Sequence, residues 1–272
     1  MTEHIDEAKN DKPLILITND DGIDAPGIRH LYNAVQELGE VLVVAPTQQC
    51  SATSHTVTIF RDMEYRQVHH EDRLWGHALD GMPADCVKFG ALHLADRLPN
   101  LLLSGINPGS NVGNNILYSG TVGAAREGAM LGIPSAAFSL DCRDEKNDGG
   151  AMHFDAAEYW ANWVARNILE NGLPRGVYLN VNIPNLPLDA IGGAATARQG
   201  RLMFIDEWQP LPDAQKPQSF ANRGSAIKLE GREHEDVDDA VLRSGRVAIS
   251  PLHFDTTHHE SMQWLKQWRQ GE

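Results

Sequence analysis

Four residues with oxygen-bearing side chains are placed where each could help to bind a divalent cation. Asp20 and Asp21 directly follow an apolar run, and Ser51 and Asn107 come after two further apolar runs. Adjacent carboxylates repel each other and lose solvation at the edge of a fold, and a hard cation offsets both effects. Oxygen ligands with open positions favour Mg²⁺ or Mn²⁺ over metals that prefer thiolates. Taken alone, the stretch 19–22 is equally compatible with a solvated turn.

A second set of residues is suited to an anionic ligand. Ser119 and Thr121 precede a run of small residues, which predicts a helix that one of them caps. Free N–H groups and hydroxyls at a helix start can bind an anion, although a cap without a ligand is more common. The loop 107–115 is rich in glycine and asparagine, so it could present N–H groups and amide oxygens or simply form a long turn. The chain has neither the GxGxxG spacing nor a P-loop.

A parallel α/β sheet would bring these scattered residues together. Four short apolar runs lack the alternation of half-exposed strands, which predicts strands buried on both faces. They are residues 14–18, 40–46, 101–106 and 134–140. Apolar residues recur at helical spacing from Ile28 to Leu38, and this strand–helix–strand order predicts a parallel sheet. Ligands bind at the carboxyl ends of strands in such sheets, so the candidate residues would line one crevice.

The middle of the chain predicts a hairpin and several further elements. Residues 56–60 and 63–68 are β-prone and alternate, which indicates a hairpin. The other expected elements are strands at 75–79 and 177–184, a helix that opens at 81–87, a charged loop at 141–150 and a helix at 154–171.

The pattern changes at Ile191, where β-prone segments replace the strand–helix alternation. Strands are expected at 196–205, 226–229 and 247–252, with a connection at 210–223 and an amphipathic tail helix that includes Met262, Leu265 and Trp268. We therefore predict an α/β fold, with a Rossmann-like, mostly parallel sheet flanked by helices and a β-rich C-terminal extension. The expected division places a catalytic core in residues 1–190 and an oligomerisation element, with the tail helix, in residues 191–272.

Composition and charge argue against several classes of partner. The 272 residues carry a formal net charge of −14, whereas a nucleic-acid polymer requires a basic face, so none is expected. No apolar run approaches the ~20 residues of a membrane span, and residues 1–12 lack the features of a signal peptide. The chain has only three cysteines, widely spaced, which indicates a reducing compartment without disulfides. We expect a cytoplasmic protein with no membrane partner.

A cation beside anion-binding donors supports the hydrolysis of phosphate esters. The cation would polarise the phosphoryl group and lower the pKa of a bound water. Donors at the helix start would stabilise the charge that develops in the transition state. An acidic protein that handles phosphate needs such a local positive field. Asp20, Asp21 and Asn107 are therefore the expected catalytic residues, and either carboxylate could act as general base.

Several motifs occur in an order that matches a known family. They are ITNDDG at 17–22, VAP at 44–46 with SAT at 51–53, GMPADC at 81–86, SGIN at 104–107, YSGTVGAA at 118–125, LNVNIP at 179–184 and RQGR at 198–201. From residue 14 to about residue 257 the chain resembles the SurE family, the stationary-phase survival nucleotidases. The resemblance implies a Rossmann-like core, a 5′-nucleotidase acting on nucleoside 5′-monophosphates, one Mg²⁺ or Mn²⁺ per subunit, and a homodimer or homotetramer with exchanged C-terminal elements.

The resemblance also implies roles for individual residues. The family's metal ligands fall on Asp20, Asp21, Ser51 and Asn107, and the expected phosphate or substrate contacts are Asn19, Asn111, Ser119, Gly120 and Thr121. Additional 3′-nucleotidase and exopolyphosphatase activities are further expectations. The chain departs from the family pattern at Ser54, where glycine is usual, and at Asn115, where aspartate is frequent.

Two alternatives stand beside metal-activated hydrolysis. Asp20 could be the nucleophile of an aspartyl-phosphate hydrolase, although such enzymes place their second aspartate two residues on rather than next to the first. The same crevice could also belong to a nucleotide-binding module without turnover. Trapping with a phosphoryl mimic tests the first alternative, and release of phosphate from AMP or GMP with Mn²⁺ tests the second.

Overall fold

The computed structural model describes residues 12–142, 151–211, 219–223, 225–228 and 235–268. Three of the predicted features are affected by the gaps. The acidic N-terminal stretch, most of the loop 141–150 and part of the connection 210–223 lie outside the described residues.

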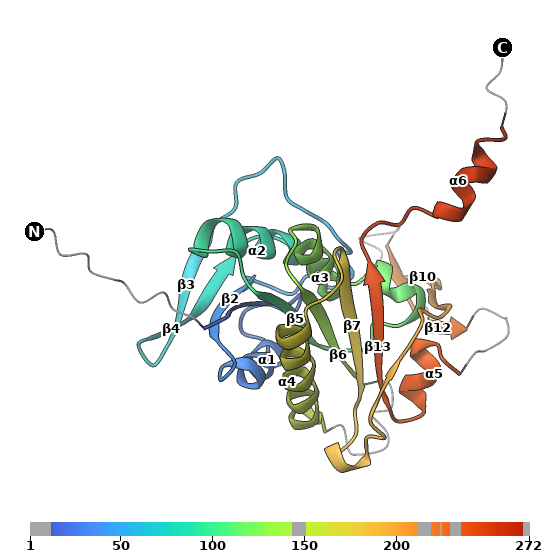
Figure 1. Cartoon of the computed structure of the whole chain (residues 1–272). Helices are drawn as coiled ribbons and strands as arrows, with labels where there is room; N and C mark the ends of the chain where they lie inside the picture. Colours follow the sequence, from blue (N-terminus) through green and yellow to red (C-terminus); the bar gives the residue numbers. More distant parts are fainter. Residues whose placement is uncertain (1–11, 143–150, 212–218, 224, 229–234, 269–272) are drawn as a thin grey trace, which may run out of the picture.

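A nine-stranded sheet forms the centre of the molecule (Figure 1). Its strands are β1 (Leu14–Thr18), β2 (Glu40–Pro46), β3 (Tyr65–His70), β4 (Arg73–Leu79), β5 (Leu101–Pro108), β6 (Ser135–Asp141), β7 (Val177–Pro184), β8 (Ala194–Thr196) and β13 (Val247–His253). They lie in the order β3-β4-β2-β1-β5-β6-β7-β13-β8. The run from β4 to β7 is parallel, whereas β3 and β13 are antiparallel to their neighbours β4 and β7. The predicted mostly parallel sheet is therefore confirmed.

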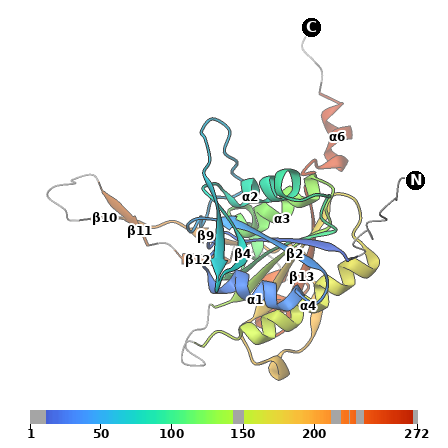
Figure 2. The same cartoon turned by 90° about the vertical axis from the view of Figure 1, so that its left-hand side faces the viewer.

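Helices cover both faces of this sheet. They are α1 (Pro26–Val35), α2 (Pro83–Phe89), α3 (Gly120–Met130), α4 (Phe154–Asn171), α5 (Asp238–Arg243) and α6 (His259–Leu265), with single turns at Gly90–Leu94, Gly113–Leu117 and Leu188–Ala190. Figure 2 shows α2 and α3 on one face and α1 and α4 on the other. Ile15 and Ile17 of β1 pack toward α1 and α4, and Leu16 packs toward α2 and α3. None of the described helices has the length and apolar character to cross a membrane.

The order of the strands reverses at β1. From β1 the chain moves outward through β2 and β4, returns to β5 on the other side of β1, and moves outward again through β6 and β7. The helix after β1 packs on one face and α3, which follows β5, packs on the other. Such a topological switch point is where doubly wound sheets bind ligands, at the carboxyl ends of the strands.

The predicted hairpin of residues 56–60 and 63–68 is wrong, because β3 pairs with β4 instead. The turn between these strands is formed by Glu71 and Asp72, whose φ angles of 48° and 60° suit a tight hairpin turn. Thr58 donates its backbone N–H to the Asp85 carboxylate at 2.9 Å. A side chain of α2 thus holds this segment as a loop, although its alternating pattern resembles that of a strand.

The C-terminal segment contributes to the sheet and also extends beyond it. β8 and β13 join the main sheet next to β7. Two further antiparallel pairs are β9 (Leu202–Ile205) with β12 (Ser225–Lys228), and β10 (Trp208–Pro210) with β11 (Phe220–Asn222). The β10–β11 pair reaches away from the sheet in Figure 2, and α6 lies apart from it in both views. The division of the chain at residue 190 stays a prediction.

Candidate functional site

Asp20 lies just beyond the end of β1 and faces the start of α3. Its side chain is buried, and Thr121 Oγ1 donates a hydrogen bond to its Oδ1 at 2.5 Å. A Cβ on Gly120 would lie 2.9 Å from Asp20 Cβ and 3.0 Å from its Oδ2. Glycine is therefore required for the helix start to approach the carboxylate this closely. The structure brings together these three predicted site residues from two distant segments.

Asp20 and Asp21 form an electrostatically unfavourable pair. Burial raises the pKa of Asp20, and burial together with the charge of Asp20 raises the pKa of Asp21 to about 6. Asp21 Oδ1 accepts a hydrogen bond from Gln49 Nε2 at 3.3 Å. Its buried Oδ2 has no hydrogen-bond partner among the described residues. Because a buried oxygen without a partner is unfavourable, this atom is suited to ligate a cation.

Asn19 shapes the turn that presents the two carboxylates. Its Oδ1 accepts a hydrogen bond from the Gly22 N–H at 3.1 Å, and its Nδ2 donates to the Gly22 carbonyl at 2.9 Å. Gly22 has a φ of 101°, a conformation that favours glycine. We predicted Asn19 as a substrate contact; in the structure both polar atoms of its amide are used inside the turn, so it orients Asp20 and Asp21.

The segment that contains Ser51 is bonded to the turn of Asp20 through the backbone of the preceding residue, Cys50. The Cys50 N–H donates to the Asp20 carbonyl at 2.7 Å. Thr53 Oγ1 donates to the Cys50 carbonyl at 2.8 Å and closes the turn that contains Ser51. Ser51 itself is exposed, so its hydroxyl is accessible to a ligand at the sheet edge.

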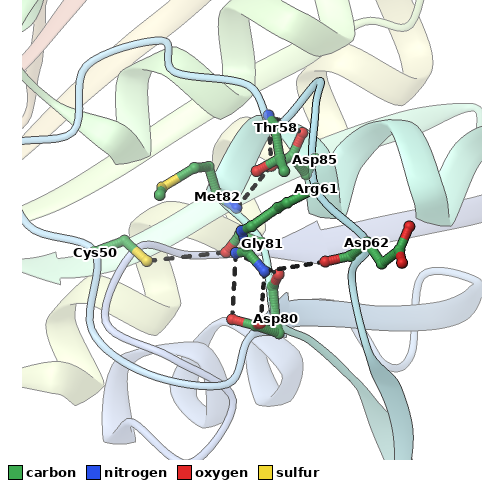
Figure 3. A network of polar contacts seen from close by, with 8 residues as sticks. All are labelled: Cys50, Thr58, Arg61, Asp62, Asp80, Gly81, Met82 and Asp85. Atoms are coloured by element: carbon green, nitrogen blue, oxygen red, sulfur yellow. Dashed lines mark hydrogen bonds and ion pairs between the residues drawn. The ribbon is translucent and has the colours of Figure 1, made fainter.

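The segment that follows β2 is also tied to the connection between β4 and α2 (Figure 3). Arg61 forms an ion pair with Asp80, with Nη1 and Oδ2 2.6 Å apart. Asp85 accepts the hydrogen bond from the Thr58 N–H at 2.9 Å. At the other end, Cys50 Sγ approaches a carbonyl of the same connection at 3.9 Å. Burial, with nearby carboxylates, raises the pKa of the Cys50 thiol, so this group is not set up as a nucleophile.

Asn107 lies near the end of β5, on the other side of the switch point. β5 pairs in parallel with β1, with Ser104 opposite Thr18, so both strands end at the same edge. Asn107 Nδ2 donates to the Gly109 carbonyl at 2.6 Å. This bond uses the donor of the amide and leaves the amide oxygen, which is the atom that can ligate a cation.

Ser119 caps α3, as one of the two predicted possibilities. Its Oγ accepts a hydrogen bond from the Val122 N–H at 3.2 Å. The N–H groups of Gly120 and Thr121 belong to the first turn, where helix N–H groups have no partner within the helix. The Thr121 N–H already interacts with the Asp20 carboxylate and opposes the rise of its pKa by burial, so the Gly120 N–H is the one available to an anion beside Asp20.

Asn111 is held by a network of buried polar side chains. Its N–H donates to Asn182 Oδ1 at 2.8 Å, and its carbonyl accepts from Asn180 Nδ2 at 2.8 Å and from Asn182 Nδ2 at 3.1 Å. Its own Nδ2 donates to Ser139 Oγ at 2.8 Å. These supporting residues were not among the predicted site residues. Two asparagines at alternate positions of an otherwise buried strand were the available signal.

Asp238 holds the same loop from the C-terminal segment and was also missed. It is fully buried, and its carboxylate accepts hydrogen bonds from the Gly113 N–H at 2.8 Å and the Gly200 N–H at 3.0 Å. Gln199 Nε2 donates to the Gly113 carbonyl at 3.1 Å. Burial raises the pKa of Asp238, and the backbone N–H groups oppose that shift. The acidic run around residue 238 was the signal that could have indicated a structural carboxylate.

The candidate metal ligands supply oxygen atoms only. Among the residues that the structure describes, no group of three or more His, Cys, Asp or Glu is placed to hold a metal ion. A cation at the switch point would rely on two carboxylates, one hydroxyl and one amide oxygen. This set fits Mg²⁺ or Mn²⁺, which bind oxygen and retain several waters.

Fold and site together define a Rossmann-like α/β protein with an acidic, oxygen-rich site at the switch point of its sheet. The family model described as "Survival protein SurE" matches residues 15–206. The chain belongs to the SurE family, as the order of its motifs predicted.

Relatives resemble almost the whole chain. The 5′-nucleotidase SurE of Syntrophobacter fumaroxidans is 38% identical over 254 residues, which cover 93% of this chain and 98% of the relative. The 5′-nucleotidase SurE of Carboxydothermus hydrogenoformans is 40% identical, over 93% of this chain and 95% of its own. The crystal structure of the SurE protein from Aquifex aeolicus matches with a TM-score of 0.78 and 36% identity, over 93% of this chain and 98% of its own.

Proposed function

We propose that this chain is a divalent-metal-dependent phosphomonoesterase that hydrolyses nucleoside 5′-monophosphates to nucleoside and phosphate. The relatives named 5′-nucleotidase SurE support this substrate class. The observation that carries the proposal is the adjacent pair of buried Asp20 and partly buried Asp21, with an unpartnered Asp21 carboxylate oxygen among the described residues, beside the start of α3.

Asp20, Asp21, Ser51 and Asn107 would hold one Mg²⁺ or Mn²⁺ ion per subunit. When bound, the ion would polarise the phosphoryl group and acidify a water molecule. The other tasks belong to groups of this chain. The Gly120 N–H at the start of α3 would bind a phosphate oxygen as charge develops on it. A carboxylate of the pair would accept the proton of the attacking water, while the bond between phosphorus and the nucleoside oxygen breaks and that oxygen takes up a proton.

Thr121 connects binding and catalysis in this proposal. Its hydroxyl holds Asp20 in one orientation, while its backbone N–H lies in the first turn of α3. This N–H also interacts with the Asp20 carboxylate, so the carboxylate and the neighbouring Gly120 N–H are parts of one rigid unit. These groups would contact the phosphoryl group and not the base or the sugar, so they would not select among phosphate esters. We therefore extend the proposal to 3′-nucleotidase and exopolyphosphatase activity.

A phosphate-release assay with metal and substrate varied together tests this function. Dialysed protein is incubated with 5′-AMP, 5′-GMP, 3′-AMP or short polyphosphate, in EDTA, Mg²⁺ or Mn²⁺. We expect release from the 5′-monophosphates that EDTA abolishes and Mn²⁺ restores. Asn107→Ala should lower the rate to below about a hundredth of the wild-type rate. Undiminished release in EDTA contradicts metal dependence, nucleotide binding without release favours a binding module, and a covalent phosphoryl adduct on Asp20 favours the aspartyl-phosphate mechanism.

We also propose a homodimer or homotetramer in the cytoplasm. Trp208 and Phe220 on β10–β11, and Trp264 and Trp268 in the tail, are more than half exposed, and aromatic surface of this kind is suited to a second copy. The chain has only three cysteines, widely spaced at Cys50, Cys86 and Cys142, which supports a reducing compartment. Light scattering should give the mass of two or four chains, and a monomer would contradict the proposal.

A further inference from the structure

A histidine–glutamate pair lies behind the turn that carries Ser51. His55 Nε2 and Glu127 Oε2 are 2.7 Å apart, and the two side chains are 17% and 7% exposed. Glu127 is on α3, and its carboxylate accepts the hydrogen bond that the imidazole N–H donates. A carboxylate this deeply buried requires such a partner. Neither residue is among the candidate ligands.

The turn with Ser51 needs support because its own backbone is unfavourable. Ala52 and Ser54 have φ angles of 57° and 58°, a region that residues other than glycine rarely adopt. The Ser54 N–H donates to the Tyr118 carbonyl at 2.9 Å, and Ser54 Oγ donates to the Leu117 carbonyl at 2.6 Å. The turn is therefore held against the residues that lead into α3.

Close packing fastens the turn to α3 at a second point. A Cβ on Gly123 would lie 2.6 Å from the Ser54 carbonyl oxygen and 3.2 Å from His55 Cα. Glu127 lies one helical turn farther along the same helix. Backbone packing at Gly123 and the His55–Glu127 pair thus hold the Ser51 turn at two consecutive helical turns of α3.

One helix, α3, therefore positions two segments that carry candidate metal ligands, the turn with Asp20 and the turn with Ser51. Thr121, in its first turn, holds Asp20, and Glu127 holds the turn that contains Ser51. Resting on the proposed function, we infer that His55 and Glu127 are positioning residues that set the place of Ser51 relative to Asp20, and with it the affinity of the site for a divalent cation. They act through the Ser51 turn and do not touch the substrate.

A second histidine–glutamate pair provides a matched control. His30 Nδ1 and Glu158 Oε1 are 2.5 Å apart and connect α1 to α4. These helices pack on the face of the sheet opposite α3. Removing this pair deletes the same two side-chain types and a comparable contact between elements, with no link to the Ser51 turn.

Calorimetric titration of metal-free, full-length protein with MnCl₂ tests the inference. The double variant His55→Ala/Glu127→Ala leaves no buried carboxylate without a partner. We expect its Kd for Mn²⁺ to rise by about 10- to 100-fold, the range for residues that orient metal ligands. His30→Ala/Glu158→Ala should keep the wild-type Kd within about twofold. Glu127→Gln should also stay near wild type, because its amide oxygen still accepts the imidazole N–H. Phosphate release by the first variant should recover to within a few-fold of wild type at saturating Mn²⁺.

A further variant keeps the inference testable if the double substitution does not fold. Gly123→Ala pushes against the backbone of the turn and leaves both side chains of the pair in place, so its Kd should rise as well. Unchanged Mn²⁺ affinity in a folded His55→Ala/Glu127→Ala protein, or in Gly123→Ala, overturns the positioning role alone. An equal rise in the His30→Ala/Glu158→Ala control also overturns it, since the effect would then be general destabilisation. Wild-type protein that binds no Mn²⁺ overturns the proposed metal dependence itself.

Discussion

The two sides of the candidate site are held in place by different means. On the acidic side, Asp20 and the turn with Ser51 are both fastened to α3, a single helix that packs on the sheet beside them. On the amide side, the loop after β5 is fastened by Asn182 of β7 and by Asp238 of α5, two buried side chains from much later in the chain.

Because of this difference, we expect the acidic side to serve the reaction and the amide side to stabilise the fold. The acidic side brings together the carboxyl groups of Asp20 and Asp21, whose pKa values are raised by burial, so its arrangement opposes folding while both are ionised and no cation is bound. On the amide side, Asn182 and Asp238 satisfy buried backbone N–H groups of the loop after β5, so these contacts support folding. Substitutions on the acidic side should mainly remove activity, and substitutions on the amide side should first remove stability.

The largest effect is expected for Asp20→Asn. The amide oxygen can still accept the hydrogen bond from Thr121, so the fold should survive. The loss of a charged ligand should reduce phosphate release at saturating Mn²⁺ by at least about 100-fold. Circular dichroism checks the fold and a steady-state assay checks the rate. Full activity after extensive dialysis would rule out the assigned role and, with it, the contrast between the two sides.

Asp238→Ala should cause the largest loss of stability. The N–H groups of Gly113 and Gly200 would stay buried without their acceptor, which should lower the free energy of unfolding by about 3 kcal/mol. Urea denaturation measures this difference. Asp236→Ala is the control, because its ion pair with Arg198 is exposed and screened by solvent, so its loss should change stability little. Equal stability of the two variants would show that the C-terminal segment does not hold the amide side.

Asn182→Ala should have an intermediate effect. The substitution removes one acceptor and one donor from the Asn111 backbone, so we expect a loss of about 2 kcal/mol. The loop, held less firmly, should also slow phosphate release by about tenfold. This variant should therefore lose both stability and activity, whereas Asp20→Asn should mainly lose activity and Asp238→Ala should mainly lose stability. Asn167→Ala, on the exposed surface of α4, should leave both quantities at their wild-type values. A change in activity without a change in stability would place Asn182 with the acidic side instead.

The smallest effect concerns the pH dependence of the metal-free protein. The pKa of Asp21 is raised from 3.8 to about 6 in the folded state, so the folded chain binds this proton more tightly than the unfolded chain. Stability should therefore fall as the pH rises from about 4 to 6. The loss should be about 1 kcal/mol, because the partly exposed carboxyl is screened by solvent. Thermal denaturation in EDTA measures this slope.

Asp21→Asn is the matching variant for the pH experiment. It should be more stable than wild type at pH 7 in EDTA, and it should lose most of the stabilisation by Mn²⁺. A wild-type stability that rises from pH 4 to 6 in EDTA would mean that the acidic side supports folding on its own. The comparison between the two sides would then lose its physical basis.

The correctly predicted parallel strands share one property. The parallel strands are buried on both faces, so each appears in the sequence as a short apolar run, and β1 and β5 were expected within two residues of their observed bounds. The predicted hairpin failed because Thr58 is held by the Asp85 side chain, a contact between distant residues that period-two alternation does not encode. Local patterns predict structure where local burial decides it.

The candidate site divides in the same way. Asp20, Asp21, Ser51 and Asn107 could be proposed as ligands because each follows an apolar run that predicted a strand. Asn182 and Asp238 were missed because they bond to backbone atoms of the loop after β5. A backbone N–H has the same chemistry at every position, so no residue type in the loop indicates its partner.

The sequence by itself determined the parallel strands, the capped start of α3 and the set of oxygen atoms that could bind a cation. It could do so because burial and capping depend on residues close together in the chain. Only the tertiary structure decided that α3 holds both acidic-side ligand segments and that the C-terminal segment holds the amide side. These contacts join residues far apart in sequence, and they form only when the sheet has brought their elements together.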